Sequence, residues 1–433
     1  MMPYRLLGLI VLAIGIPIAT FYLAMATPAL RPGAAAFSGG TRYPPSPVAF
    51  EFLNLGDPVA GLPQITNVQI VDLDQDGQNE VLACDALGNR ILRLKRNASG
   101  GWDESTLIAD VAVPAHVTAA DLDSDGDLDL IVAVLGNILP DDGVIGRVEA
   151  FENRGDGTYV RHVVLDDVRR VADVQAGDLD GDGDLDLAVA VFGYARGSVM
   201  RLENLGDWQF REHLLLNAPG AIHVPTGDFD QDGDLDIAAI VTQDEEELWG
   251  FENQGDGQFV ARRLWMTPNL DLGGAGLTAA DLDGDGDLDL IMPAGDNLED
   301  FNAFPQPYHG CYWFENQGDW QFQPHRISDL GGAYAASVAD IDQDGTQDVV
   351  LASLTNDWLN PENAALIWLQ NDGKQNFAAW QIASAPLHLV TTAVGDLDGD
   401  EMPDIVAGSL NLRRPHQRLG RISGWMNQGL KKP

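Results

Sequence analysis

A nine-residue acidic pattern, DxDxDGxxD, recurs along the chain and constrains its fold more than any other feature. The pattern occurs seven times, with a mean spacing of (396 − 72)/6 = 54 residues between copies. A fixed period in this range indicates a repeat architecture in which each period forms one structural unit. The copies begin at Asp72, Asp121, Asp178, Asp228, Asp281, Asp340 and Asp396.

Each period contains four short apolar runs separated by turn signals. In the third repeat these runs are residues 174–179, 185–192, 198–203 and 210–216. They have the length of strands and are rich in Val, Ile, Leu and aromatic residues, and no helical stripe follows residue 47. Four strands per period are typical of a propeller blade. The sequence therefore predicts an all-β, seven-bladed β-propeller that carries one acidic loop per blade.

A second landmark, an aromatic residue or leucine followed by Glu-Asn, marks the third strand of most repeats, as at residues 151–153 and 314–316. The last repeat ends at its third strand, near residues 425–427. Residues 48–56 resemble the missing outer strand, and we expect them to pair with the last blade and close the ring, which removes open sheet edges. The propeller is predicted over residues 48–429.

The repeated loops place four carboxylates at positions 1, 3, 5 and 9, all aspartate except Glu80. Such clusters repel one another strongly unless a cation lies among them. Oxygen donors suit Ca²⁺, which takes six to eight oxygen ligands, whereas Mg²⁺ demands a stricter geometry and keeps its water. Position 7 varies, which fits a ligand from the backbone carbonyl. We expect up to seven structural Ca²⁺ ions, one per loop.

The expected ligands, copy by copy, are Asp72, Asp74, Asp76, Gln78 and Glu80; Asp121, Asp123, Asp125, Asp127 and Asp129; Asp178, Asp180, Asp182, Asp184 and Asp186; Asp228, Asp230, Asp232, Asp234 and Asp236; Asp281, Asp283, Asp285, Asp287 and Asp289; Asp340, Asp342, Asp344, Thr346 and Asp348; and Asp396, Asp398, Asp400, Met402 and Asp404.

Two alternatives compete with a calcium loop of this kind. An EF-hand needs a glutamate at position 12 and flanking helices, but the second and third copies carry Val132 and Val189 there, between strands. A metal-free acidic turn remains open. The seventh copy departs furthest from the pattern, because Glu401 replaces the glycine of position 6 and Pro403 follows nearby.

The acidic motif, its spacing and the four-strand period resemble the FG-GAP/VCBS repeat family over residues 48–429. That family includes the head propeller of integrin α subunits and many exported bacterial proteins. The resemblance implies calcium in the acidic loops, which would share one face with the third-to-fourth strand turns. Variable loops would form the opposite face. The family also contains a sugar-binding lectin and carbohydrate-active lyases and dehydratases.

The N-terminus and the overall charge limit location and partners. Residues 6–25 are uncharged and long enough to span a bilayer, so residues 1–25 form either a signal anchor or a cleaved signal peptide. Residues 26–47 are expected to be a flexible linker. Both alternatives predict an extracytoplasmic propeller, which is periplasmic, cell-surface or secreted. The net charge of −41 excludes nucleic acid as a natural partner.

Several polar residues are expected at the mouth of the central channel, just before the inner strands: Asn67, His116, Asp173, His223, Tyr334 and His388. We interpret them as the polar lining of a wet channel. The alternative is a metal or acid–base cluster formed by His116, His223, Tyr334 and His388. The acidic run at residues 244–247 is expected to be a solvated loop.

The function predicted first is a non-catalytic binding or adhesion scaffold for a glycan or a protein. The alternative is a carbohydrate-active enzyme of the lyase or dehydratase type. A third hypothesis is a structural component of a surface layer. The sequence contains no nucleophile motif and no phosphate-binding glycine loop that would favour the enzyme.

Overall fold

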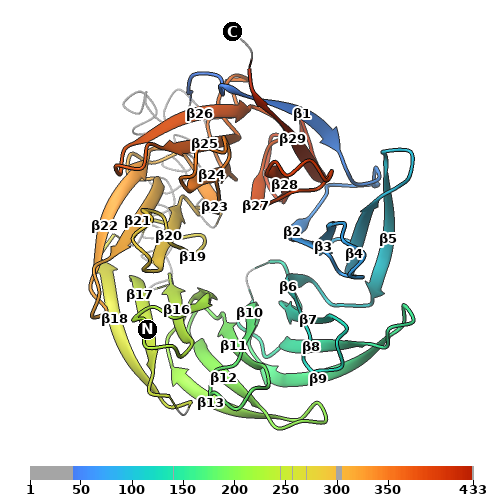
Figure 1. The fold of residues 1–433 in the computed structure, drawn as a ribbon, viewed down its shortest axis with the longest axis vertical. Helices are drawn as coiled ribbons and strands as arrows, with labels where there is room; N and C mark the ends of the chain where they lie inside the picture. Colours follow the sequence, from blue (N-terminus) through green and yellow to red (C-terminus); the bar gives the residue numbers. More distant parts are fainter. Residues whose placement is uncertain are drawn as a thin grey trace, which may run out of the picture.

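The computed structural model describes residues 42–139, 141–243, 245–255, 257–269, 271–298 and 305–431. Within these ranges the regular secondary structure consists of strands, with no helix, and the strands form seven sheets. The sheets are arranged as blades around a ring (Figure 1), which confirms the predicted all-β, seven-bladed propeller. The predicted hydrophobic segment at residues 6–25 lies outside the described residues. In the described part of the chain, no helix is long and apolar enough to cross a membrane.

The first four blades follow one another along the chain. Blade one contains β2 (Ile65–Val71), β3 (Glu80–Asp85), β4 (Arg90–Arg96) and β5 (Trp102–Ala109). Blade two contains β6 (Pro114–Ala120), β7 (Asp129–Val134), β8 (Gly146–Asn153) and β9 (Tyr159–Val168). Blade three contains β10 (Val171–Gly177), β11 (Asp186–Val191), β12 (Ser198–Asn204) and β13 (Phe210–Leu216). Blade four contains β14 (Ala221–His223), β15 (Thr226–Gly227), β16 (Asp236–Val241), β17 (Glu246–Asn253) and β18 (Phe259–Thr267).

The last three blades complete the ring. Blade five contains β19 (Thr278–Ala280), β20 (Asp289–Ala294), β21 (Gly310–Asn316) and β22 (Phe322–Ser328). Blade six contains β23 (Ala333–Ala339), β24 (Asp348–Ser353), β25 (Leu366–Asn371) and β26 (Phe377–Ala383). Blade seven contains β27 (Leu389–Gly395), β28 (Asp404–Ser409), β29 (Ile422–Leu430) and β1 (Val48–Asn54).

The second strand of every blade is buried along its whole length, because neighbouring blades cover both of its faces. In β7, Leu130 and Val132 pack toward blade one, whereas Ile131 and Ala133 pack toward blade three. Side chains alternate between the two faces of a strand, so a strand covered on both sides needs a continuous apolar run. This explains the short Val/Ile/Leu runs that follow each acidic loop.

The ring closes by pairing the two ends of the described chain. The first strand, β1, pairs antiparallel with β29 and forms the outer edge of blade seven (Figure 1). Val48 is buried in the same cluster as Trp368 and Trp425. Just before β1, Ser46 accepts a hydrogen bond of 2.9 Å from the Trp368 indole in blade six. The N-terminal strand is therefore fixed to two blades at once.

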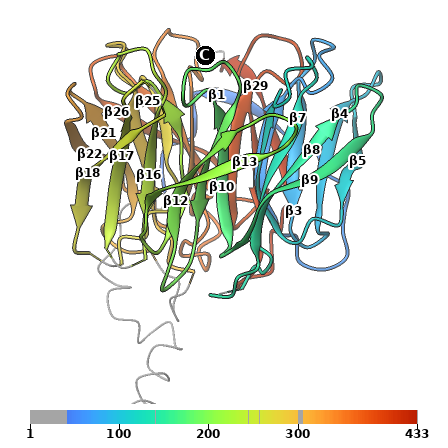
Figure 2. The ribbon, with the colours of Figure 1, turned by 90° about the horizontal axis from the view of Figure 1, so that it is seen from below.

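The propeller has two chemically different ends, seen edge-on in Figure 2. Because the strands in each blade are antiparallel, the acidic loops between first and second strands lie at the same end as the turns between third and fourth strands. We call this the acidic end. The loops between second and third strands, together with the connections between blades, lie at the opposite end, which we call the loop-rich end.

The asparagine of the second landmark links each blade to its predecessor. The Asn316 amide donates to Phe229 O at 2.8 Å in blade four and to Leu288 O at 3.1 Å in its own blade. Equivalent links to the preceding acidic loop recur at Asn204, Asn253, Asn371 and Asn427. Since these side chains are buried, each satisfies backbone carbonyls that water does not reach.

We predict that Asn316→Ala lowers the free energy of unfolding by roughly 1–3 kcal/mol, because it leaves buried carbonyls of two blades without a donor. The midpoint of urea unfolding measures this change. The matched control is Asn153→Ala, since the Asn153 amide donates to Leu128 O within its own blade at 3.1 Å. Equal losses in the two variants would contradict the proposed role of the inter-blade bond.

Candidate metal sites and the central cavity

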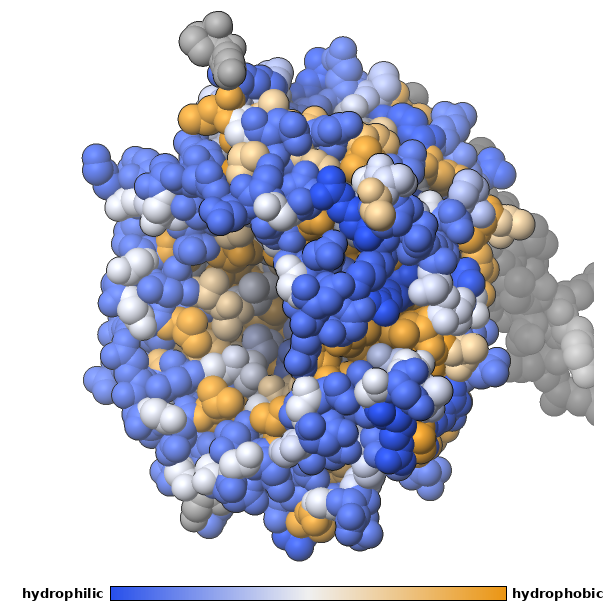
Figure 3. Space-filling view, turned by 45° about the vertical axis from the view of Figure 1, so that its right-hand side comes forward, coloured by the Kyte–Doolittle hydropathy of each residue, from blue (hydrophilic) through white to orange (hydrophobic). Residues whose placement is uncertain are grey.

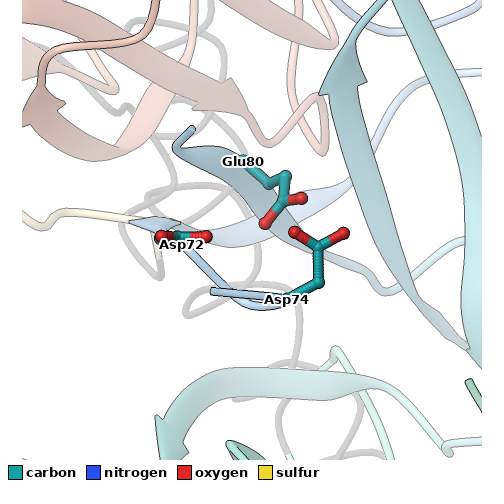
Figure 4. Close-up of side chains that lie close together, drawn as sticks. All are labelled: Asp72, Asp74 and Glu80. Atoms are coloured by element: carbon teal, nitrogen blue, oxygen red, sulfur yellow. The ribbon is translucent and has the colours of Figure 1, made fainter. Parts of the chain in front are cut away.

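Backbone hydrogen bonds fold each acidic loop around its first aspartate. In loop two, Asp121 accepts the backbone N–H groups of Asp125 and Gly126, both at 3.0 Å. Gly126 has φ = 98°, a left-handed conformation that glycine adopts without strain. In several loops, three carboxylates offer oxygen atoms within 4.8 Å of one another. Figure 4 shows the group formed by Asp72, Asp74 and Glu80 in loop one.

The ninth residue of each loop is a buried carboxylate that joins the loop to its blade. Asp129 accepts the backbone N–H of Leu122 at 2.9 Å and that of Asn153 at 2.8 Å. Burial raises its pKa to about 6, and it raises the pKa of Asp289 in loop five to about 7. Burial therefore penalises the ionised form of these groups, and a nearby cation would offset that penalty.

Unpartnered oxygen atoms provide a test of whether the loops fit a metal ion. The Oδ1 atom of the third loop residue is buried and lacks a hydrogen-bond partner among the described residues in loops four to seven: Asp230, Asp283, Asp342 and Asp398. A buried polar atom without a partner is costly. A cation held by the cluster would satisfy these oxygens, so the residues of these four loops fit a metal ion.

Among the described residues, basic side chains form ion pairs with the carboxylates of two of the seven loops, which the sequence analysis did not predict. In loop one, Lys95 and Arg93 from β4 contact the carboxylates of Asp74 and Glu80. Burial would raise the pKa of Asp74, but hydrogen bonds from these two cations hold it below its usual value. In loop three, the Arg201 guanidinium contacts Asp180 and donates to Asp186 at 2.7 Å.

A cavity of about 1140 Å³ occupies the middle of the ring and is lined by residues from all seven blades. Its wall comprises the beginnings of first strands and the ends of second strands, so it faces the loop-rich end. Polar and aromatic side chains meet there, among them Tyr194 and Arg170, whose guanidinium stacks 5.1 Å from the Tyr194 ring centroid. Figure 3 shows the largely hydrophilic surface and a hollow within the ring.

Two of the predicted channel histidines converge on one buried carboxylate in this cavity. His116 Nδ1 lies 3.2 Å from Asp173 Oδ1, and His223 Nδ1 lies 3.6 Å from Asp173 Oδ2. Gln175 and the backbone N–H of Val224 donate to the same carboxylate at 2.9 and 3.0 Å. Burial would raise the pKa of Asp173, but both histidines and these donors hold it below its usual value. Burial lowers the pKa of His223.

The other two candidates take different positions. Tyr334 in β23 lines the same cavity, where burial and the nearby Asp296 carboxylate raise the pKa of its phenol. His388 is buried away from the cavity wall, with Nδ1 3.0 Å from Leu354 O and Nε2 3.2 Å from Pro415 O. The predicted four-residue cluster therefore divides into a histidine pair, a separate tyrosine and a histidine bound to backbone carbonyls.

Glu246 corrects the expectation of a solvated acidic run at residues 244–247. It is 2% exposed, lines the cavity and accepts the backbone N–H groups of Gly273 at 3.0 Å and Gly274 at 3.2 Å. Burial raises its pKa to about 8. The local sequence gave no signal for this placement, because the glycines that enclose the carboxylate lie in the connection to the next blade.

We predict that Glu246 makes stability fall as pH rises from about 4.5 to about 8. The folded state keeps the proton over this range while the unfolded state loses it, since the ordinary pKa is 4.5 and the folded value is about 8. The slope reaches at most about 1.4 kcal/mol per pH unit. Urea unfolding across this range should show the decline relative to Glu246→Gln. Parallel stability curves for the two proteins would refute the assignment.

Comparisons with known proteins add to this description. A family model described as FG-GAP-like repeat matches five stretches of the chain, residues 72–132, 138–189, 178–239, 228–292 and 295–351. A search of curated proteins finds no match.

Solved structures share the fold at low sequence identity. The crystal structure of BBS1N in complex with ARL6DN, soaked with lead, matches with 14% identity and a TM-score of 0.53, over 89% of this chain and 100% of the other. Its mercury-soaked counterpart matches with 12% identity and a TM-score of 0.52, with the same coverage. The rhamnogalacturonan lyase YesW matches with 16% identity and a TM-score of 0.46, over 88% and 76% of the two chains. At these identities, the two BBS1N matches show the fold alone.

Proposed function

This chain belongs to the FG-GAP-like repeat family, and from that premise we propose that it is an exported, Ca²⁺-stabilised scaffold that binds a glycan or a protein at its loop-rich end. The propeller fold of this family supports a binding scaffold. Residues 6–25 would act as a membrane anchor or a signal peptide, and the propeller would lie in the periplasm, at the cell surface or outside the cell.

The central cavity is the observation that carries this proposal. Its volume of about 1140 Å³ would accommodate several sugar rings or a peptide segment. The buried Asp173 and the two histidines beside it give the wall fixed hydrogen-bonding groups. Arg170, stacked on Phe192 and Tyr194, adds a cation and aromatic faces. Apolar walls with a few positioned polar groups are typical of ligand sites.

Calcium is the metal that the acidic loops fit best. Each of loops four to seven offers several carboxylates and contains no histidine or cysteine, and carboxylate oxygens are the ligands that Ca²⁺ prefers. Positions 1, 3, 5 and 9 would hold the ion through carboxylates, and position 7 through its carbonyl. When bound, the ion would cancel the mutual repulsion of the aspartates and fix each loop between two strands.

We predict that EGTA lowers the melting temperature by at least roughly 5 °C, because each ion that binds only the folded state adds about 2.7 kcal/mol at a hundredfold excess over its Kd. Differential scanning calorimetry measures the shift. Added Ca²⁺ should restore the original transition, whereas Mg²⁺ at the same concentration should restore little of it. An unchanged melting curve in excess EGTA would remove the calcium part of the proposal.

A carbohydrate-active enzyme of the lyase or dehydratase type is the second candidate, favoured by the histidine pair. Asp173 would accept a hydrogen bond from Nδ1 of His116, which would leave Nε2 of this imidazole as a proton acceptor at the cavity wall. The lowered pKa of His223 favours the neutral imidazole that a general base requires.

One experiment on the calcium-loaded chain distinguishes the binding scaffold from the enzyme. A glycan array carrying neutral and acidic oligosaccharides would identify a ligand. His116→Gln/His223→Gln should then weaken its binding at least about tenfold, or about 1.4 kcal/mol. The control is His213→Gln, because His213 is half-buried on β13, outside the cavity lining, and pairs with Glu203. Formation of unsaturated sugar products by the wild type but not by the double variant would select the enzyme. Full affinity in the double variant would exclude the cavity as the binding site.

A further inference from the structure

One residue of the third strand faces each acidic loop, and blade one reverses its charge. In every blade this residue comes directly after the third-strand residue that pairs with the tenth position of the loop. Blades two to five carry glutamate there: Glu152, Glu203, Glu252 and Glu315. Blades six and seven carry Gln370 and Met426. Blade one carries Lys95.

The Lys95 ammonium lies among the carboxylates of loop one. Its Nζ is 2.7 Å from Asp74 Oδ2, 2.7 Å from Asp76 Oδ2 and 2.9 Å from Glu80 Oε1. The Arg93 guanidinium contacts Asp74 and Glu80 as well. Three carboxylates therefore converge on one nitrogen in the manner in which they would converge on a metal ion.

Loop five shows the contrasting arrangement. Asp283 holds the position of Asp74, and its Oδ1 is buried without a partner among the described residues. Both oxygens of Asp74 lie within 2.9 Å of Lys95 Nζ. The third-strand residue that aligns with Arg93 is Trp313 in blade five, which brings no charge. Loop one therefore lacks the unsatisfied oxygens that make loops four to seven fit a cation.

We propose that loop one takes no metal ion, because Lys95 and Arg93 replace the ion in this loop. The two side chains together carry the charge of one divalent cation, so they neutralise the cluster to the same extent. An entering ion would have to displace both, and their charges would then repel it at close range. This inference rests on the proposed calcium sites in the other loops and limits them to loops two to seven.

Because Lys95 and Arg93 neutralise loop one, this loop would keep its structure without metal. It lies at the seam of the ring, where blade one meets blade seven. Loop one borders blade seven, where the Asn79 amide donates to Asp396 O at 2.8 Å and Arg96 donates to Asp398 O at 2.7 Å. On its other side, Gln75 donates to Gly126 O of loop two at 2.8 Å. The junction between the first and last blades would therefore resist chelation.

The test counts the ions bound per full-length chain after equilibrium dialysis against Ca²⁺, with elemental analysis as the readout. We expect one ion fewer than the number of loops. Asp283→Ala should lose one further ion, whereas the matched substitution Asp74→Ala should leave the count unchanged. Loss of an ion in Asp74→Ala would overturn the inference.

The converse variant tests the role of the two cations. Arg93→Ala/Lys95→Glu gives blade one the residue types that blade two carries at the aligned positions, Ala150 and Glu152. This variant should bind one ion more per chain than the wild type. The control is Arg211→Ala, which removes a cation on β13, the outer strand of blade three, where Arg211 pairs with Glu203 of β12. It should not change the number of bound ions. A wild type with one ion in every loop would refute only this inference, whereas a wild type without calcium would refute the proposed calcium sites themselves.

Discussion

The burial of a carboxylate at the start of every second strand is the constraint on which this propeller depends. These residues, such as Asp129 and Asp289, are almost fully inaccessible and accept backbone N–H groups from two different segments of their blade. An ionised group in this position is costly unless charge or hydrogen bonds compensate it. A cation held in the acidic loop would add to the compensation from these hydrogen bonds, at the same point where the hydrophobic core begins.

The two ends of the propeller follow from this constraint. At the acidic end, the loops are short, similar to one another and linked from blade to blade by landmark asparagines such as Asn316. Little freedom remains there for binding surfaces. At the loop-rich end, the connections differ in length from blade to blade, and the cavity lies among them. A rigid ring with variable loops on one side is a common arrangement for binding proteins.

The strand pattern could be predicted from the sequence because each blade repeats the same local signals. The acidic motif, the apolar run after it and the Glu-Asn landmark are all contained within one period. The histidine pair and its carboxylate are different. His116, Asp173 and His223 lie about one repeat apart on three blades, so their contact depends on how neighbouring blades stack. No local pattern distinguishes them from His388, which meets backbone carbonyls instead.

Lys95 shows how a repeat can be changed at one position while the fold is kept. Its backbone pairs in the register that blades two to five use for glutamate, so the strand is unaffected by the exchange. The side chain then changes how the adjacent loop is neutralised. A divalent ion is available only when its concentration allows, whereas an ammonium group is part of the chain from its synthesis. Blade one meets the closing blade, and a seam held by covalently attached cations would form before any ion binds, which makes this the blade where such an exchange has the clearest physical benefit.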